Sequence, residues 1–393
     1  MSNPSRSDSI SESQEARSDE VEYSSSDAES DTEFEVQPLT SKDRKLALWK
    51  EKKRQNRREH AYKRQKEQRV QEALSVIGEG SSKHVAVIKL QRRPELAREM
   101  EGKRFDHTDP IFDDFKRIGG KGSGTVVVLD EDTDEDMTQE DLDTFNYVFT
   151  YFRKDQRLHL PVKNNHAMIK GQMTAIGWRV CMETGQAVGT YAPSPAGKKH
   201  IEAWLEHRKG AIEVHRIYAN SFCNLAPNMY RSQVQQRAKL GVPALGVDYE
   251  NNNLPFLFCS NLAYTHNDFE NLGHLDNDVS TFTHGMGGNV DKATGRLASF
   301  EDGFRMEGAF FYVADYGLLI EYDKIDGVVE QVWQGSKHVY GTVGGKVKEG
   351  FTRYGSSAQI NQRLTAKVAK YQVDGEGIIV DDQEYAARYG KRS

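Results

Sequence analysis

Residues 265–278, THNDFENLGHLDND, contain the pattern His-x-Asp twice, first as His266 and Asp268 and then as His274 and Asp276. Side chains alternate between the two faces of an extended strand, so each triplet would present an imidazole and a carboxylate on one side. Each pair is therefore a candidate set of two metal ligands. The spacing inside the two triplets is the same and does not choose between them.

A second histidine and an arginine follow in strand-like sequence. His338 comes shortly after the apolar run at 327–333, and Arg353 lies fifteen residues further on, where it would share a strand face with Gly355 and Ser357. Two histidines and a carboxylate form the open iron(II) site of oxygen-activating enzymes. A guanidinium can hold the far carboxylate of a dicarboxylate cosubstrate through two parallel hydrogen bonds. The order His-x-Asp, His, Arg therefore predicts a double-stranded β-helix oxygenase.

The flanking sequence predicts an α+β fold. Two helical stretches, 198–208 and 226–240, precede short runs rich in β-branched and aromatic residues, which Gly, Asn and Asp interrupt at turn-like intervals. Several short strands after a few helices favour a sandwich or barrel with helices on one face. With the ligand order, we expect a jelly-roll or cupin-like double-stranded β-helix core with flanking helices.

The N-terminal region has a different composition. Residues 1–40 hold eleven Ser and eleven Asp or Glu against two Arg, which predicts a disordered acidic tail. Residues 42–69 carry thirteen Lys or Arg against four acids, and 41–77 lack Pro and Gly, which predicts a basic helix. Only Leu74 and Ile77 follow at zipper positions, so an import signal or an electrostatic arm is favoured over a leucine-zipper region. Either role favours polyanions.

The remainder divides into three parts. We assign 78–165 to a linker and an N-terminal helical extension, in which Thr138 and Asp141 form the capping box of a helix. Residues 166–373 form the compact α+β domain, and 374–393 form a C-terminal tail.

Two features bear on the compartment. No apolar run is long enough to cross a membrane, and the first thirty residues lack the apolar core of a secretory signal. The three cysteines, Cys181, Cys223 and Cys259, are widely spaced, which fits a reducing compartment and not a disulfide framework. We expect a nuclear protein, with the cytoplasm as the alternative, that is neither secreted nor membrane-bound.

Five motifs carry a resemblance to a known family. They are IKGQMTAIGWR (169–179), QAVGTYAPSPAGK (186–198), NDFENLGHLDNDVS (267–280), the stretch around His338, and TRYGSSAQI (352–360). In these motifs, which lie between Met168 and Lys370, the chain resembles the fungal Tet-like 2-oxoglutarate/Fe(II) oxygenases, distant relatives of the Tet and JBP enzymes. The family pattern Asn-x-Phe-x-Asn-x-x-His-x-Asp-x-Asp aligns Asn267, Phe269 and Asn271 ahead of His274 and Asp276. The resemblance thus implies that the second triplet binds the metal and that His266 does not.

The resemblance also implies the cofactors. Fe(II) would be held by His274, Asp276 and His338, and 2-oxoglutarate would bind the iron while Arg353, beside Ser357, anchors its far carboxylate. Arg363 is the rival for the anchoring role, because some relatives have basic residues there. Spacing from His338 favours Arg353.

Further residues are candidates for the surroundings of the metal. Asp278 would face the same side as Asp276 and could accept a hydrogen bond from a ligand imidazole. Asn267 belongs to the family pattern. Aromatic side chains near the triplet could line a pocket for a flat substrate or pack in the core; they are Tyr264, Phe269 and Phe282.

Resemblance to Tet and JBP enzymes implies hydroxylation of the methyl group of a 5-methylpyrimidine in nucleic acid, so that methylated DNA would be the substrate partner. Such a base must be flipped out of the duplex. Two alternatives stay open. One is an oxygenase that acts on a protein or a small molecule, and the other is an inactive copy that keeps the fold and binds DNA or partners. The oligomeric state is left undetermined.

Overall fold

The computed structural model describes residues 50–61, isolated positions between 63 and 75, and residues 92–118, 124–126, 138–162, 167–251 and 253–390. The predicted acidic tail at 1–40 lies outside these residues, as do parts of the predicted basic helix and linker. Within the described ranges, no helix combines the length and the apolarity that a membrane crossing requires.

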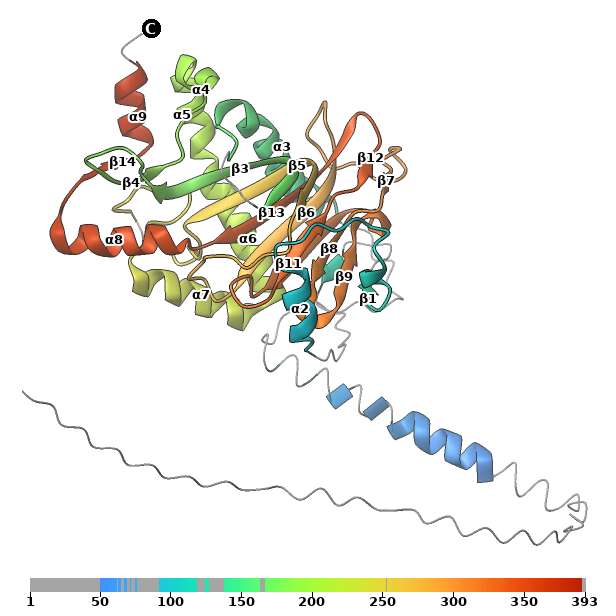
Figure 1. Ribbon diagram of the computed structural model, residues 1–393. Helices are drawn as coiled ribbons and strands as arrows, with labels where there is room; N and C mark the ends of the chain where they lie inside the picture. The colour runs from blue at the N-terminus through green and yellow to red at the C-terminus, as the bar shows by residue number, and fades with distance from the viewer. Residues whose placement is uncertain are drawn as a thin grey trace, which may run out of the picture. The chain divides into compact units, whose positions relative to one another are not determined.

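Two large sheets build the folded part of the chain, and β7 and β12 pair in a separate two-stranded sheet (Figure 1). The larger has the order β14-β4-β3-β5-β13-β6-β10-β2, and the smaller has the order β1-β9-β8-β11. Their central strands pair antiparallel, while the edge pairs β14 with β4, β10 with β2 and β1 with β9 are parallel. The bounds are β1 Lys116–Ile118, β2 Gly124–Val126, β3 Met168–Val180, β4 Gln186–Thr190, β5 Asn261–Asn271, β6 Thr283–Asp291, β7 Met306–Glu307, β8 Phe310–Val313, β9 Leu318–Glu321, β10 Val328–Trp333, β11 Tyr340–Val343, β12 Lys346–Val347, β13 Phe351–Gln359 and β14 Ile378–Val380.

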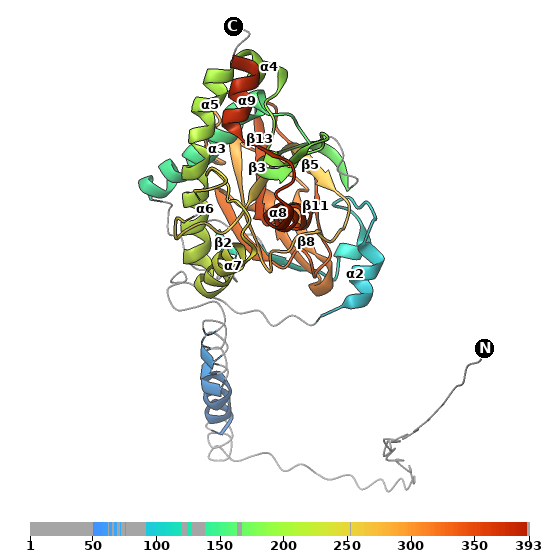
Figure 2. The same ribbon diagram turned by 90° about the vertical axis from the view of Figure 1, so that its left-hand side faces the viewer.

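Helices cover one face of the larger sheet. Figure 2 shows α3 and α6 on one side of it and β8 and β11 on the other. Even-numbered residues of β5 and β13, such as Leu262 and Tyr354, are buried against these helices. This mixture of helices and largely antiparallel sheets confirms the predicted α+β class. The helices are α2 Pro94–Met100, α3 Gln139–Leu158, α4 Pro195–Lys199, α5 Ile201–Lys209, α6 Ala211–Leu225, α7 Pro227–Leu240, α8 Gln362–Asp374 and α9 Asp382–Tyr389.

The predicted start of α3 is confirmed. The Thr138 hydroxyl accepts from the Asp141 backbone N–H at 3.2 Å, and the Asp141 carboxylate accepts from the Thr138 N–H at 3.3 Å, which is a capping box. Val148, Phe149 and Phe152 then project from one face of the helix into the core. The helix assigned to an N-terminal extension therefore shares the core of the larger sheet.

Regular secondary structure continues beyond residue 373. Residues 374–393, assigned to a tail from the sequence, contain β14, which pairs with β4, and α9, which packs with α5. Val380 and Tyr385 are buried beside Trp204 of α5.

The N-terminal part of the chain is described by itself. Its residues 50–61 form a helix whose side chains are exposed, and these include six Lys or Arg and two Glu.

A buried carboxylate ties α3, α5 and β5 together. Asp155 Oδ1 accepts from His159 Nδ1 at 2.8 Å and from His207 Nε2 at 3.0 Å, and its Oδ2 accepts from the Tyr264 hydroxyl at 2.9 Å. Burial opposes ionisation of Asp155, but the two histidines outweigh it and hold the pKa of the carboxyl below its usual range. The ionised carboxylate is thus a structural link between helices and sheet.

We expect Asp155→Asn to lower the free energy of unfolding by about 2–4 kcal/mol at pH 7, because the three buried donors lose a charged acceptor. A depressed pKa stabilises the fold above the unfolded-state value of about 4 and loses that effect as the pH falls through the folded-state value. The difference between variant and parent should therefore shrink below pH 4. Urea unfolding at several pH values measures it, with exposed Asp114→Asn as a neutral control; a loss of the same size at every pH contradicts the assignment.

Candidate active site

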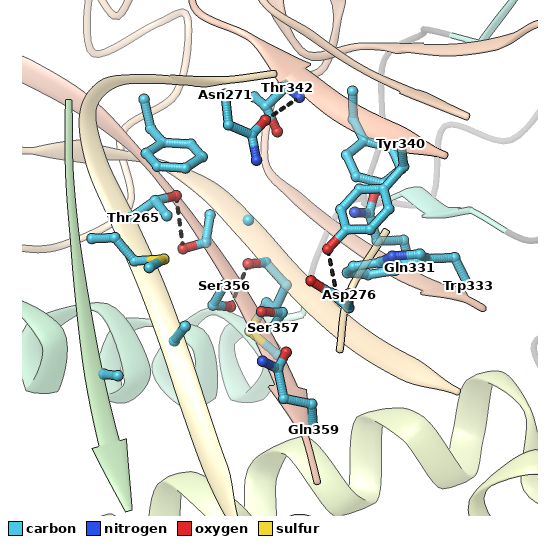
Figure 3. A pocket seen from close by; sticks show the side chains of 18 of the residues that line it. Thr265, Asn271, Asp276, Gln331, Trp333, Tyr340, Thr342, Ser356, Ser357 and Gln359 are labelled. Carbon is cyan, nitrogen blue, oxygen red and sulfur yellow. Dashed lines mark hydrogen bonds between the residues drawn. The ribbon is translucent and has the colours of Figure 1, made fainter. Parts of the chain in front are cut away.

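A cavity of about 240 Å³ lies between the two sheets. Strands β3, β5, β6, β10 and β13 of the larger sheet supply one wall, and β8 and β11 of the smaller sheet supply the other. Most residues of β5 and β13 that face it are odd-numbered, because the even-numbered ones face the helices. Figure 3 shows Asp276 and Tyr340 at one side and Ser356, Ser357 and Gln359 along β13. Of the predicted site residues, the cavity is lined by Phe269, His274, Asp276, Arg353 and Ser357.

His274 and Asp276 form a close pair at the cavity wall. His274 Nε2 lies 3.6 Å from Asp276 Oδ1. His274 Nδ1 donates to the Leu272 carbonyl oxygen at 2.8 Å, which leaves the Nε2 lone pair free on the side of the carboxylate. Two ligands of one metal, each about 2.1 Å from it, lie about 3 Å apart. The pair therefore fits two positions of a metal centre.

The second oxygen of Asp276 is held by the opposite wall. The Tyr340 hydroxyl donates to Asp276 Oδ2 at 2.6 Å, and burial, together with the neighbouring carboxylate, raises the pKa of Tyr340. Gly335 adjoins the same oxygen, and a Cβ there would lie 2.8 Å from Asp276 Oδ2. The carboxylate is thus fixed by one hydrogen bond and by a contact that only glycine permits.

The segments that carry the two predicted histidines lie side by side. His274 and Tyr340 exchange two backbone hydrogen bonds, of 3.0 and 3.1 Å, and His338 precedes Tyr340 by two residues. The His338 imidazole, however, does not line the cavity. Its Nδ1 lies 3.5 Å from Asp315 Oδ1 and its Nε2 lies 3.4 Å from the Tyr316 hydroxyl. Among the described residues, no three His, Cys, Asp or Glu side chains form a complete metal cluster.

Arg353 supplies a positive charge to the cavity. Its guanidinium carbon lies 3.2 Å from the centroid of the Tyr322 ring, and no acidic side chain of the described residues pairs with it. Desolvation lowers the pKa of this guanidinium. Gly287 makes room for it, because a Cβ there would lie 2.5 Å from Arg353 Nη2. A desolvated guanidinium at a cavity wall is a ready site for a carboxylate.

The structure does not bring five other predicted residues to the cavity, and the first of them, Phe282, packs against the hydrophobic core of the larger sheet. Tyr264 lies in the core on the helix side of β5, where its hydroxyl bonds to Asp155. Asn267 lines a separate hollow on the same side. Arg363 is exposed in the first turn of α8. Asp278 Oδ2 is buried without a hydrogen bond, and desolvation and the Asp276 carboxylate raise the pKa of Asp278 well above its usual range.

Several cavity residues had no signal in the sequence. Trp333 Nε1 and Gln359 Oε1 are buried polar atoms without a hydrogen-bond partner. Tyr340 lies two residues after His338, and this spacing was the only clue to it. Four further amide side chains line the cavity, those of Asn261, Asn271, Gln331 and Asn361.

Comparison with known proteins gives one family. The model of the Tet-like 2OG-Fe(II) oxygenase superfamily matches residues 138–345, which include His274, Asp276 and His338 and end before Arg353. No curated protein matches the chain significantly.

Proposed function

Because the chain belongs to the Tet-like 2OG-Fe(II) oxygenase superfamily and is therefore a 2-oxoglutarate-dependent dioxygenase, we propose that it hydroxylates the methyl group of a 5-methylpyrimidine in nucleic acid. When bound, Fe(II) would let O2 react with 2-oxoglutarate and a substrate C–H bond, so that one oxygen atom enters the substrate as C–OH and the other enters succinate, with release of CO2. The protein binds and orients the reactants and excludes water. The observation that carries the proposal is the single cavity that His274, Asp276 and Arg353 share.

We propose that His274, Asp276 and His338 hold the iron. The 3.6 Å separation of His274 Nε2 and Asp276 Oδ1 supports the first two. The third is supported by Asp315, because a carboxylate beside the Nδ1 of a ligand histidine is a common means of orienting it. Binding would require the His338 imidazole to turn from Tyr316 towards the cavity. The Tyr340 hydroxyl is the competing donor, since it already lies against Asp276.

Arg353 is the proposed anchor of the far carboxylate of 2-oxoglutarate. The Ser357 side chain lies four residues further along the same face of β13 and lines the same cavity. Arg353 and the His274–Asp276 pair line one cavity, and this supports the binding of one dicarboxylate between them. Arg363, exposed on α8, does not line this cavity and is the weaker candidate.

The arrangement of the sheets supports a double-stranded β-helix. The larger sheet faces the smaller one across an apolar layer that includes Phe311, Val329 and Tyr340, and the cavity opens in this layer. Two facing antiparallel sheets with a site between them are the architecture of jelly rolls.

A heterocyclic substrate suits the lining of the cavity. The Trp333 and Tyr340 rings, 5.4 Å apart, offer aromatic surfaces. The free Trp333 Nε1–H and the free Gln359 Oε1 offer one donor and one acceptor for the polar edge of a base. The exposed basic helix at 50–61 suits phosphate attraction or nuclear import, so we place the protein in the nucleus with methylated DNA as its partner.

The test is an anaerobic titration of the full chain with Fe(II) and 2-oxoglutarate, followed by oxygen and mass analysis of methylated and unmethylated oligonucleotides. We expect succinate release and a mass increase of one oxygen only with the methylated strand. Parallel reactions with peptides and free nucleosides are included. Succinate release that depends on a peptide or a free nucleoside, and not on the oligonucleotide, would contradict the nucleic-acid substrate but not the oxygenase activity.

We expect Gly287→Ala to raise the KM for 2-oxoglutarate by about tenfold, because the added Cβ displaces the Arg353 guanidinium and weakens one charge-assisted interaction. Steady-state succinate release measures this. Gly390→Ala is a matched control, since its nearest neighbour would be 3.7 Å from the new Cβ. An unchanged KM in Gly287→Ala would separate Arg353 from cosubstrate binding.

A further inference from the structure

A second hollow, of about 190 Å³, lies on the helix side of the larger sheet. The last turns of α3 and the adjacent ends of β5, β6 and β13 form its walls. His266 and Tyr354 line it, while the residues just before them on the same strands, Thr265 and Arg353, line the other cavity. His266 and Asn267 of the first His-x-Asp triplet thus line a separate hollow.

The hollow gathers three cationic side chains. Arg153 and Arg157 lie one turn apart on α3, and Lys292 follows β6. Neighbouring like charges are unfavourable, and within the described ranges none of the three is in an ion pair. Arg153 Nε donates to the Lys292 carbonyl oxygen at 2.8 Å, which joins α3 to the end of β6. This bond does not use the two terminal nitrogens of the guanidinium.

One carboxylate also lines the hollow. Asp291 accepts from the Thr294 N–H at 2.7 Å and from the Thr294 hydroxyl at 2.9 Å, and these bonds lower the pKa of Asp291. Its negative charge is therefore partly satisfied within its own turn. Three cations against one such carboxylate leave the hollow positively charged.

The floor is polar and rigid. His266 is 4% exposed and lies 5.7 Å, centroid to centroid, from the ring of Tyr354. Asn267 and Asp268 have φ of 59° and 55°, and among the described residues they alone have positive φ without being glycine. The Asn267 N–H donates to the Thr352 hydroxyl at 3.0 Å, which fixes this bend. The bend brings a buried imidazole and an amide to a basic rim.

We propose that this hollow binds a phosphate group. Two guanidiniums, an ammonium and neutral donors match the several oxygens of a phosphate, and three cations exceed what one carboxylate would neutralise. The phosphate belongs either to a small anion or to a nucleic-acid backbone. The site is separate from the cavity of the candidate active site and does not depend on the proposed reaction.

The test measures binding of inorganic phosphate, and of an unmethylated single-stranded oligonucleotide, to the full chain by isothermal titration calorimetry. The variants are Arg157→Ala and Lys292→Ala, both at exposed positions, with Arg363→Ala on α8 as the matched control. We expect each of the two variants to weaken phosphate binding by about tenfold or more, and the control to bind as the parent does.

The oligonucleotide arm separates the sources. Oligonucleotide binding that weakens together with phosphate binding supports a backbone phosphate, and oligonucleotide binding that stays unchanged supports a small anion. The proposal is overturned if the parent does not bind phosphate, or if both variants bind phosphate as tightly as Arg363→Ala. Thermal unfolding of each variant checks that the fold is kept.

Discussion

We expect His274→Ala to lose Fe(II) binding by at least about a hundredfold and to lose turnover with it. Its Nε2 lies 3.6 Å from Asp276 Oδ1, and both residues line the cavity. Removal of a ligand costs more than loss of a supporting hydrogen bond, which alone weakens metal binding by about 10–100-fold. Anaerobic titration with Fe(II), followed by its visible absorption in the presence of 2-oxoglutarate, measures the affinity.

His266→Ala is the matched control, because His266 lies on the helix side of β5, in the second hollow, and should leave iron binding intact. The reverse result, with iron lost in His266→Ala and kept in His274→Ala, would falsify the assignment of the triplet. The third ligand is tested in the same titration. We expect His338→Ala to lose iron and Tyr340→Phe to keep it; the opposite pattern would assign the third position to the tyrosine hydroxyl.

Arg353→Ala should raise the KM for 2-oxoglutarate by about a hundredfold or more, because truncating one partner of a desolvated charge pair typically costs about 2–5 kcal/mol. The cause is the loss of the only guanidinium that lines the cavity within the described structure. Arg353→Lys should recover part of the affinity, since a lysine keeps the charge but not the paired hydrogen bonds.

Initial rates of succinate release over a range of 2-oxoglutarate concentrations give the KM, and Arg363→Ala is the control. Iron binding without cosubstrate should be unchanged in Arg353→Ala. A large KM effect in Arg363→Ala with none in Arg353→Ala would transfer the anchoring role to α8.

The parts of the site that lie on regular strands could be predicted from the sequence. Arg353 and Ser357 share a face of β13 as their spacing requires, and both line the cavity. His338 could not be placed in this way, because β11 begins at Tyr340 and the residues before it form a turn, where strand alternation does not apply.

The sequence also could not tell which face of β5 meets the helices. Alternation groups Tyr264 with His266, but only the packing of α3 and α6 decides that this face is the core side. The expected helices at 198–208 and 226–240 correspond to α5 and α7, whereas α6 was missed. Its apolar residues are buried against the sheet, and only Gly210 separates it from α5. The C-terminal β14 and α9 were missed because a three-residue strand has too little pattern to recognise.

On strands β5 and β13, most side chains of one face line the cavity, and side chains of the other face pack against the helices. Damaging substitutions along them should therefore fall into two kinds that alternate residue by residue: proteins that accumulate normally but do not turn over, and proteins that fail to accumulate. A duplicated gene that accumulates substitutions on the cavity face of one of these strands could therefore lose enzymatic activity while the protein still folds. Its expression level would not reveal the loss.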